Sequence, residues 1–345
     1  MPVSAFLVAL SKDLMNQNIR RYLATVCLAV ATGPSFAGGS NYGVVPGTRV
    51  LSGRVSEWPV PTPEFARDPA VGADGNVYIT EKRADRIARF DPRTATFTEW
   101  NMPPGTRPHG LVVDRAGIVW YSGNGNGTIG ELDPRTGNIV HHPLPSGGDP
   151  HTLVFDAQGN LWFSVYAGNR IGRLDRQTRK VTEYRVTGGP YGIAIDHDGK
   201  VWYCAMDGDK IGRLDPETGN VVELRTGKTS APRRMTIAPD GLLWVTLAGN
   251  GKLLKIDPKT RRVLRELALP AGPGGGPYAV TADGAGRIWV NEIESDSVVL
   301  VDPRTEAMQV FNLPTKNEGI RKMVVDAQGR LWYMGSHSGR LGMIQ

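Results

Sequence analysis

Short runs of alternating apolar and polar residues repeat along most of the chain, at a spacing of about 40 to 45 residues. One repeat reads as Pro, an apolar run, Asp-x-x-Gly, a run with Trp and a second aromatic residue, Ile-Gly-Arg-Leu-Asp-Pro-x-Thr-Gly, and finally Val-x-Glu. The repeats begin at seven positions, which are Pro69, Pro108, Pro150, Pro190, Pro232, Pro277 and Ile320. A repeat of this length with two-residue alternation is typical of β-propeller blades.

Turn residues divide each repeat into four predicted strands. The alternation stops at an Asp-x-x-Gly turn, at a Gly- and Asn-rich loop and at an Asp-Pro-x-Thr-Gly turn. The last repeat ends at Gln345 after three strands, whereas an extra strand-like stretch, residues 55–60, precedes the first repeat. The sequence therefore predicts an all-β fold: a seven-bladed β-propeller of four-stranded blades over residues 55–345, in which the N-terminal strand completes the last blade and closes the ring.

Tryptophan recurs at one place in six of the repeats, and tyrosine takes that place in the first. Such a series could suggest an aromatic cage for a ligand, but an identical position in every strand predicts packing between blades. The residues are Tyr78, Trp120, Trp162, Trp202, Trp244, Trp289 and Trp332.

The first 37 residues differ from the repeats and are predicted to be an export signal. Arg20 and Arg21 supply positive charge, residues 22–32 are mostly apolar, and residues 35–37 resemble a small-x-small cleavage site. The apolar stretch is shorter than the roughly 20 residues that a membrane-spanning helix needs. We therefore expect a cleaved signal at 1–37, a linker at 38–54 and a periplasmic or secreted protein without a membrane span. A translation start at Met15 would give the signal a more ordinary N-terminal region.

Charge and cysteine content narrow the possible partners. The formal net charge is +6, but the basic residues are spread among repeated turns such as Asp-Pro-Arg-Thr. Nucleic-acid-binding proteins usually concentrate basic residues on one surface, so we expect no nucleic-acid partner. Cys27 lies in the predicted signal and Cys204 is then alone, which excludes an intrachain disulfide. We expect a monomer that binds a small molecule or a cyclic peptide.

The repeat also predicts where a site would lie. Antiparallel pairing brings the start of the first strand and the end of the second to the same end of a blade, and the first strand lines the channel. The residue after each leading Pro should therefore form a ring at one mouth. This ring would comprise Ala70, His109, His151, Tyr191, Arg233, Tyr278 and Arg321. Six of these are polar or aromatic and they vary, unlike a framework position.

Two histidines, His109 and His151, are predicted to face this mouth. A neutral His is suited to act as a general base near pH 7. The two histidines could instead only fill the space at the mouth of the channel. Asp149 precedes Pro150-His151, and Tyr166 follows the second strand of the same repeat. A carboxylate and a phenol are therefore predicted beside the imidazoles, although Asp before Pro is also common in turns.

Residues 150–174, with Pro-His, Asp-x-x-Gly-x-Leu-Trp-Phe and Asn-Arg-Ile-Gly-Arg-Leu, resemble the repeats of the streptogramin B lyase (virginiamycin B lyase) family. The resemblance extends over about residues 55–345 and implies a seven-bladed propeller. It also implies a magnesium-dependent β-elimination that opens the ester of a cyclic depsipeptide antibiotic. In that reaction a base removes the threonine α-proton, the carboxylate leaves the β-carbon, and the metal stabilises negative charge.

The resemblance implies roles for the residues of three consecutive repeats. His151 would be the general base, His109 its partner, Asp149 a metal-side carboxylate and Tyr191 a substrate contact. From their place at the mouth, further substrate contacts are predicted at Tyr166, Arg233, Tyr278 and Arg321.

The sequence departs from the family pattern at one ligand position. Tyr166, preceded by Val165, stands where the family has a Glu, so one of the two carboxylates expected to hold Mg²⁺ is absent. Glu81 and Glu292 occupy neighbouring strand-two positions in other repeats, where we interpret them as structural.

Two other functions fit the sequence. A non-catalytic binding propeller would hold an anionic or aromatic ligand with Tyr191, Tyr278 and a cluster of cations formed by Arg233, Arg234, Arg321 and Lys322. A calcium-dependent sugar-lactone hydrolase would need several acidic residues at the mouth, and the predicted ring supplies few. Metal analysis of the purified protein would separate these possibilities.

Overall fold

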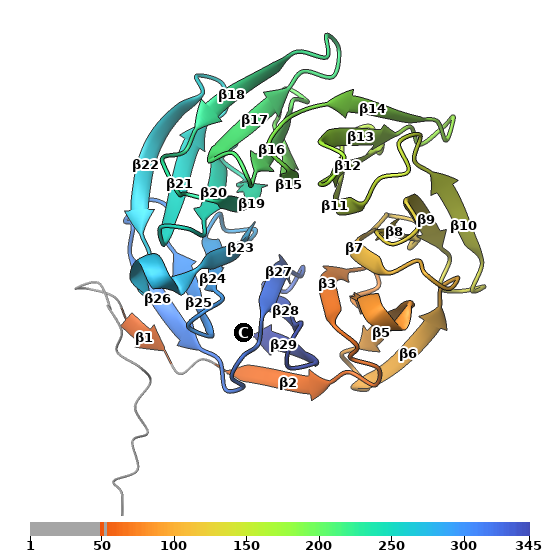
Figure 1. Cartoon of the computed structure of the whole chain (residues 1–345). Helices are drawn as coiled ribbons and strands as arrows, with labels where there is room; N and C mark the ends of the chain where they lie inside the picture. The colour runs from red at the N-terminus through yellow and green to blue at the C-terminus, as the bar shows by residue number, and fades with distance from the viewer. Residues whose placement is uncertain (1–48, 52–53) are drawn as a thin grey trace, which may run out of the picture. The chain divides into compact units, whose positions relative to one another are not determined.

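The computed structural model describes residues 49–51 and 54–345, and it shows seven blades of four antiparallel strands arranged in a ring, one of which carries an additional strand at its edge (Figure 1). In each blade the first strand is innermost and the later strands follow outward, so the polypeptide moves from the centre to the rim and then starts the next blade. The fold class predicted from the repeat is confirmed.

Each blade has its first strand at the centre of the ring and its fourth strand at the rim. Blade one contains β3 (Ala66–Val71), β4 (Val77–Glu81), β5 (Arg86–Asp91) and β6 (Thr96–Asn101), and blade two contains β7 (Pro108–Val113), β8 (Val119–Gly123), β9 (Thr128–Leu132) and β10 (Ile139–Pro143). Blade three contains β11 (Pro150–Phe155), β12 (Leu161–Val165), β13 (Arg170–Leu174) and β14 (Val181–Arg185), and blade four contains β15 (Pro190–Ile195), β16 (Val201–Ala205), β17 (Lys210–Leu214) and β18 (Val221–Arg225). Blade five contains β19 (Pro232–Ile237), β20 (Leu243–Leu247), β21 (Lys252–Asp257) and β22 (Arg262–Ala268), and blade six contains β23 (Pro277–Ala282), β24 (Ile288–Glu292), β25 (Ser297–Val301) and β26 (Met308–Asn312). Blade seven contains β27 (Ile320–Val325), β28 (Leu331–Gly335), β29 (Arg340–Ile344) and β2 (Val55–Pro59).

The ring closes as the sequence predicts. Strand β2 pairs antiparallel with β29, with Val55 opposite Ile344 and Pro59 opposite Arg340. Three residues of the predicted linker form β1 (Arg49–Leu51), which pairs in parallel with β26 and adds a fifth strand to blade six. The predicted export signal and most of the predicted linker lie outside the described residues. Within the described ranges, no helix has the length and apolar character needed to span a membrane.

Close packing inside each blade explains the repeated pairing of Trp-aromatic with Ile-Gly-Arg. A Cβ atom on Gly172 would clash with the ring of Phe163, and one on Gly212 would clash with the ring of Tyr203. The second aromatic residue of strand two therefore lies flat over the glycine of strand three. Only glycine leaves room for it.

The recurring tryptophans are buried between blades, and most share one hydrogen bond. The indole Nε1–H donates to the Asp that begins the Asp-x-x-Gly turn, at 2.8 Å in both Trp202–Asp196 and Trp332–Asp326. The same Asp accepts backbone N–H groups of its own turn. In blade five Ala238 replaces this Asp, and the buried Nε1 of Trp244 has no hydrogen-bond partner among the described residues.

We expect Ala238→Asp to stabilise the protein by about 1 kcal/mol, because it gives the buried Trp244 indole the acceptor that it lacks. Urea unfolding followed by fluorescence would measure the change. The same substitution in a Trp244→Phe background should bring no gain. A loss of stability, or a gain that persists without the indole, would contradict the explanation.

Candidate functional site

The inner strands place two successive layers of side chains across the channel. The second residue of each inner strand forms the mouth layer, which comprises Arg67, His109, His151, Tyr191, Arg233, Tyr278 and Arg321. The third residue forms the plug layer, which comprises Asp68, Gly110, Thr152, Gly192, Arg234, Ala279 and Lys322. All seven residues of the mouth layer are polar or aromatic, and the small residues of the plug layer leave space for its two long cations.

Blade one corrects the predicted ring. Ala66 pairs with Glu81 at the start of β3, as Pro150 pairs with Val165 in blade three, whereas Pro69 lies three residues further along the strand. The prediction of Ala70 as a mouth residue was therefore wrong, and Arg67 takes that place. The error arose because the leading Pro is not required there: Pro69 occupies a position that other blades fill with an apolar residue.

His109 and His151 converge, with ring centroids 4.4 Å apart. His151 Nδ1 lies 2.9 Å from the Asp149 carbonyl oxygen, which can only accept, so Nδ1 carries the proton and Nε2 keeps its lone pair. Asn124 Nδ2 lies farther from the same nitrogen, at 3.4 Å. Burial lowers the pKa of His151 to about 4, although the Asp149 carbonyl and carboxylate act in the opposite direction. The imidazole is therefore neutral at pH 7 and able to accept a proton.

His109 is the more enclosed of the two, with 1% of its surface exposed. Burial, and then the positive charge of Arg67, lower the pKa of His109 well below its ordinary value. Its Nδ1 has no hydrogen-bond partner within the described part of the chain. His109 is thus a neutral ring that packs against His151 and limits how that imidazole can turn.

Two tyrosines complete the wall beside His151. The hydroxyl oxygen of Tyr191 accepts hydrogen bonds from Tyr278 Oη at 2.7 Å and from Arg67 Nη2 at 3.2 Å. Burial alone would raise the pKa of Tyr191. The positive charges of Arg67 and Arg234 have the larger combined effect, so the pKa is lowered. Burial raises the pKa of Tyr278. The Tyr191 ring centroid lies 5.4 Å from that of His151, so a polarised phenol is held next to this imidazole.

Tyr166, which stands at the expected Glu position, contacts the next blade. Its hydroxyl donates to the carboxylate of Asp207 at 2.9 Å, and its ring centroid lies 5.8 Å from that of His151. Tyr166 therefore contributes an aromatic edge to the mouth and anchors blade three to blade four.

The predicted cluster of four cations divides between the two layers. The guanidinium carbons of Arg233 and Arg321 lie 5.6 and 5.8 Å from the Tyr278 ring centroid, at the mouth. Arg234 instead crosses the channel, donating to Asp68 at 3.2 Å and to Thr152 Oγ1 at 2.7 Å. Lys322 donates to the carbonyl oxygen of Leu111 at 2.7 Å. Arg233 and Arg321 can thus meet a ligand at the mouth, whereas Arg234 and Lys322 close the channel beneath it.

The carboxylates near the mouth do not form a magnesium site. One oxygen of Asp149 accepts the Ala167 N–H at 2.9 Å, and the other lies 3.7 Å from His151 Nδ1. Asp207 is bonded to Tyr166, and Asp68 is paired with Arg234. No three His, Cys, Asp or Glu side chains of residues 49–51 and 54–345 form a metal-ligand group. Mg²⁺ is usually held by one or two carboxylates and completes its shell with water, but each of these carboxylates is already engaged by a protein group, so this donor set does not fit the ion.

Glu81 and Glu292 lie at the ends of their second strands. Glu292 accepts the Ala271 N–H at 2.9 Å, whereas neither carboxyl oxygen of the fully buried Glu81 has a hydrogen-bond partner among the described residues. Burial, and then the neighbouring Glu99, raise the pKa of Glu81 to about 9. Glu81 is therefore protonated at neutral pH.

This shift predicts a pH-dependent effect of Glu81→Gln. The folded-state pKa lies above that of the unfolded chain, so the wild type is destabilised progressively as pH rises from about 4.5 toward 9. We expect the variant to be more stable than the wild type by roughly 5 kcal/mol at pH 8.5, and to lose this advantage at pH 4.5. Thermal unfolding at both pH values would measure it. An advantage that is equal at both values would contradict the assignment.

Sequence reasoning missed Arg67 and Asp68 as members of the two layers. The signal that could have found them is the spacing between the first strand and its Trp-equivalent residue: Tyr78 follows Arg67 by the same interval that separates Trp162 from His151. Counting back from the aromatic residue, instead of starting from a Pro, aligns all seven blades.

The sequence profile of the Virginiamycin B lyase family matches residues 46–188 and, a second time, residues 178–345. The chain belongs to the Virginiamycin B lyase family. Among solved structures, a streptogramin B lyase is 25% identical, with a TM-score of 0.77 over 84% of this chain and 97% of that chain. A comparison with curated proteins found no match.

Two more distant structures share the fold of this family member. A catalytically inactive virginiamycin B lyase from Staphylococcus aureus, solved with quinupristin, is 23% identical, with a TM-score of 0.76 over 85% of this chain and 99% of that chain. YCF48 bound to D1 peptide is 12% identical, with a TM-score of 0.71 over 91% and 99% of the two chains. At these identities the two structures show that the propeller fold is shared.

Proposed function

We propose that the chain is a lyase of the streptogramin B lyase type, which opens the ester of a cyclic depsipeptide or a related lactone by β-elimination. The observation that carries the proposal is the convergence of two neutral imidazoles, 4.4 Å apart, at a mouth lined by arginines. Family membership supports it. The reaction would take place above His151, between Tyr166 and the arginines of blades five and seven.

The proposed step uses His151 as the base. Its Nε2 takes the proton on the carbon next to the carbonyl group, and that electron pair forms a double bond to the β-carbon. The bond between the β-carbon and the ester oxygen breaks, and the carboxylate leaves with the bonding electrons. The proton then passes from His151 to water. The Asp149 carbonyl and carboxylate, near Nδ1, favour the imidazolium that forms for a moment.

Guanidinium groups would stabilise the negative charge that develops in this step. Arg233 and Arg321 are only partly buried, and both pack on Tyr278, which limits their motion. A departing carboxylate matches their paired N–H donors. No step is assigned to magnesium, because the carboxylates at the mouth do not fit it.

Incubation of the purified mature protein with quinupristin tests the proposal. Elimination yields a linear product of unchanged mass with a new carbon–carbon double bond, whereas hydrolysis adds one water, so mass spectrometry separates the two reactions. A known streptogramin B lyase serves as the positive control. We expect elimination both with magnesium and with EDTA. A mixture in which only the cyclic compound remains would refute the proposal.

A second candidate is a binding propeller without catalysis. The stacking of Arg233 and Arg321 on Tyr278 favours it, since this arrangement suits an anionic or aromatic ligand regardless of any base. Quinupristin binding that is weakened by Arg321→Ala, in a protein that forms no product, would favour this function over the lyase. Tightly held calcium in the purified protein would instead favour the lactone hydrolase.

We also propose that the protein works in the periplasm or outside the cell. Support comes from the predicted signal at residues 1–37 alone. N-terminal sequencing of the exported protein would locate the cleavage site.

A further inference from the structure

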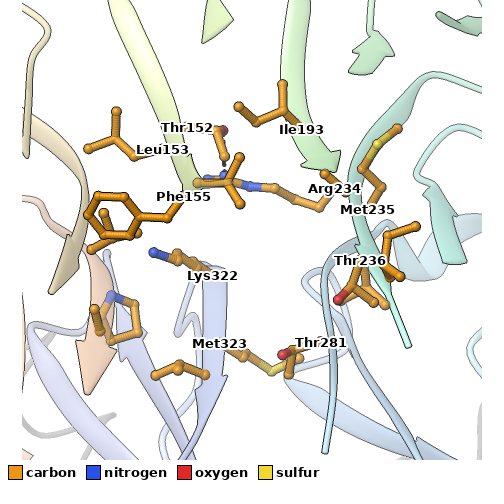
Figure 2. A pocket seen from close by; sticks show the side chains of 18 of the residues that line it. Thr152, Leu153, Phe155, Ile193, Arg234, Met235, Thr236, Thr281, Lys322 and Met323 are labelled. Carbon is orange, nitrogen blue, oxygen red and sulfur yellow. Dashed lines mark hydrogen bonds between the residues drawn. The ribbon is translucent and has the colours of Figure 1, made fainter. Parts of the chain in front are cut away.

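The channel continues beyond the plug layer as a cavity of about 520 Å³. Its walls are the later residues of the inner strands, and most of them are aliphatic, including Val112, Ile193, Met235 and Val324. Phe155 is the single aromatic residue of this wall. Figure 2 shows these side chains around an open space. Several of them, such as Ile195 and Ile237, are half-buried: they pack against the core between blades and also line the cavity.

Two cations line the end of this cavity nearest the histidines. Figure 2 shows the nitrogen ends of Arg234 and Lys322 on the same side of the cavity as Thr152. Arg234 is paired with Asp68, which is fully buried, whereas no carboxylate lies within ion-pair distance of Lys322 in the described residues. The three groups together carry one uncompensated positive charge. No Asp or Glu is among the described residues that line the cavity.

Hydrogen-bond donors remain free at this end. Lys322 has three N–H groups, and one of them donates to the Leu111 carbonyl. Nε of Arg234 is buried and has no partner in the described part of the chain. Burial lowers the pKa of Lys322 to about 8, which shows how poorly this position supports an uncompensated charge. A monoanion placed here would satisfy both the charge and the donors.

We propose that this cavity is a second binding site, separate from the mouth, which takes an aliphatic monocarboxylate with its carboxylate on Lys322 and Arg234 and its chain along the apolar wall. The three residues that follow the plug layer in an inner strand span about 10 Å, which matches a chain of about eight carbons. The cavity volume is in the usual range for a small-molecule site. The ligand would enter from the end of the channel that lies opposite the histidines, because Asp68, Arg234 and Lys322 close the end nearest to them.

Calorimetric titration of the mature protein with three probes tests the site. Octanoate has both the charge and the chain, 1-octanol lacks the charge, and acetate lacks the chain. We expect octanoate to bind at least about tenfold more tightly than either of the other two. Equal affinity for octanoate and acetate would overturn the proposal, as would a lack of heat with all three, which would indicate a channel that holds only water.

Variants locate the bound probe. Lys322→Met should weaken octanoate binding about tenfold or more and leave 1-octanol unchanged. Lys82→Met, which removes a charge on the mouth side of the plug layer near Arg67 and Asp149, should leave the binding of both probes unchanged. Thr281→Phe fills the cavity without touching either cation and should abolish binding of both probes. Thermal melting verifies that each variant is folded. Octanoate binding that survives both Lys322→Met and Thr281→Phe would refute the site, whatever the protein does with quinupristin.

Discussion

His151→Ala is expected to reduce the rate of quinupristin ring opening by at least about 10³-fold, because it removes the group that we propose accepts the proton. Among the described histidines, only His109 and His151 belong to the mouth layer, and the hydrogen bond from Nδ1 leaves Nε2 of His151 free to act. The binding surface formed by Tyr191, Arg233 and Arg321 stays in place. The loss should therefore fall on kcat, with KM changed by no more than a few fold, as measured by product formation at varied substrate concentration.

His197→Ala is the matched control, since His197 is exposed in the turn between the first two strands of blade four. It should retain wild-type turnover. The turnover of His109→Ala should fall between those of the two variants, because in the proposed reaction His109 packs against His151 and orients it without taking the proton. Turnover of His151→Ala within a few fold of the wild type would exclude this residue as the base and would leave the binding function as the better account.

Asp68→Asn is expected to destabilise the protein by about 3–5 kcal/mol, because it leaves the buried guanidinium of Arg234 without its counter-charge. The side chains of Arg234 and Asp68 are 6% and 1% exposed, so water cannot replace the lost partner. The pair joins blade five to blade one across the ring, and Arg234 also reaches Thr152 in blade three. Urea unfolding would measure the difference.

The double variant Asp68→Asn with Arg234→Met should recover most of this loss, since both charges are then gone. Glu217→Gln removes a carboxylate from an exposed pair with Lys200, at 4.0 Å, and should cost less than about 1 kcal/mol. An Asp68→Asn variant as stable as Glu217→Gln would show that the crossing ion pair does not hold the plug layer together.

The plug layer makes the two proposed sites independent. Above it lie the histidines and the arginines of the mouth, and below it lies the apolar cavity. Changes at His151 should therefore leave octanoate binding intact, and Lys322→Met should leave turnover intact. Of these substitutions, Asp68→Asn is expected to disturb both sites. It removes the ion-pair partner of Arg234, and Arg234 lies in the plug layer between the mouth and the cavity.

The sequence by itself determined the fold and much of the mouth. The turns recur at fixed places in each repeat and specify where the strands end. At these places Gly and Asp-Pro interrupt the alternation of apolar and polar residues. An incomplete last repeat and an extra N-terminal strand then require ring closure, which β2 and β29 confirm. The repeat also placed His109, His151 and Tyr191 at one end of the channel, since antiparallel pairing leaves little freedom once strand one is identified.

Only the tertiary structure decided what those side chains do. Which of four predicted cations reach the mouth depends on contacts across the ring, such as Arg234 with Asp68, between residues 166 positions apart. The place of Arg67 in the mouth layer depended on the strand register of blade one, which a Pro three residues later obscured. Burial in the ring keeps His151 neutral. Burial also lowers the pKa of Lys322, which has no carboxylate partner among the described residues. The repeated pattern of strands and turns determines each blade. The environment of the channel side chains depends on residues of different blades, which come together only when the ring closes.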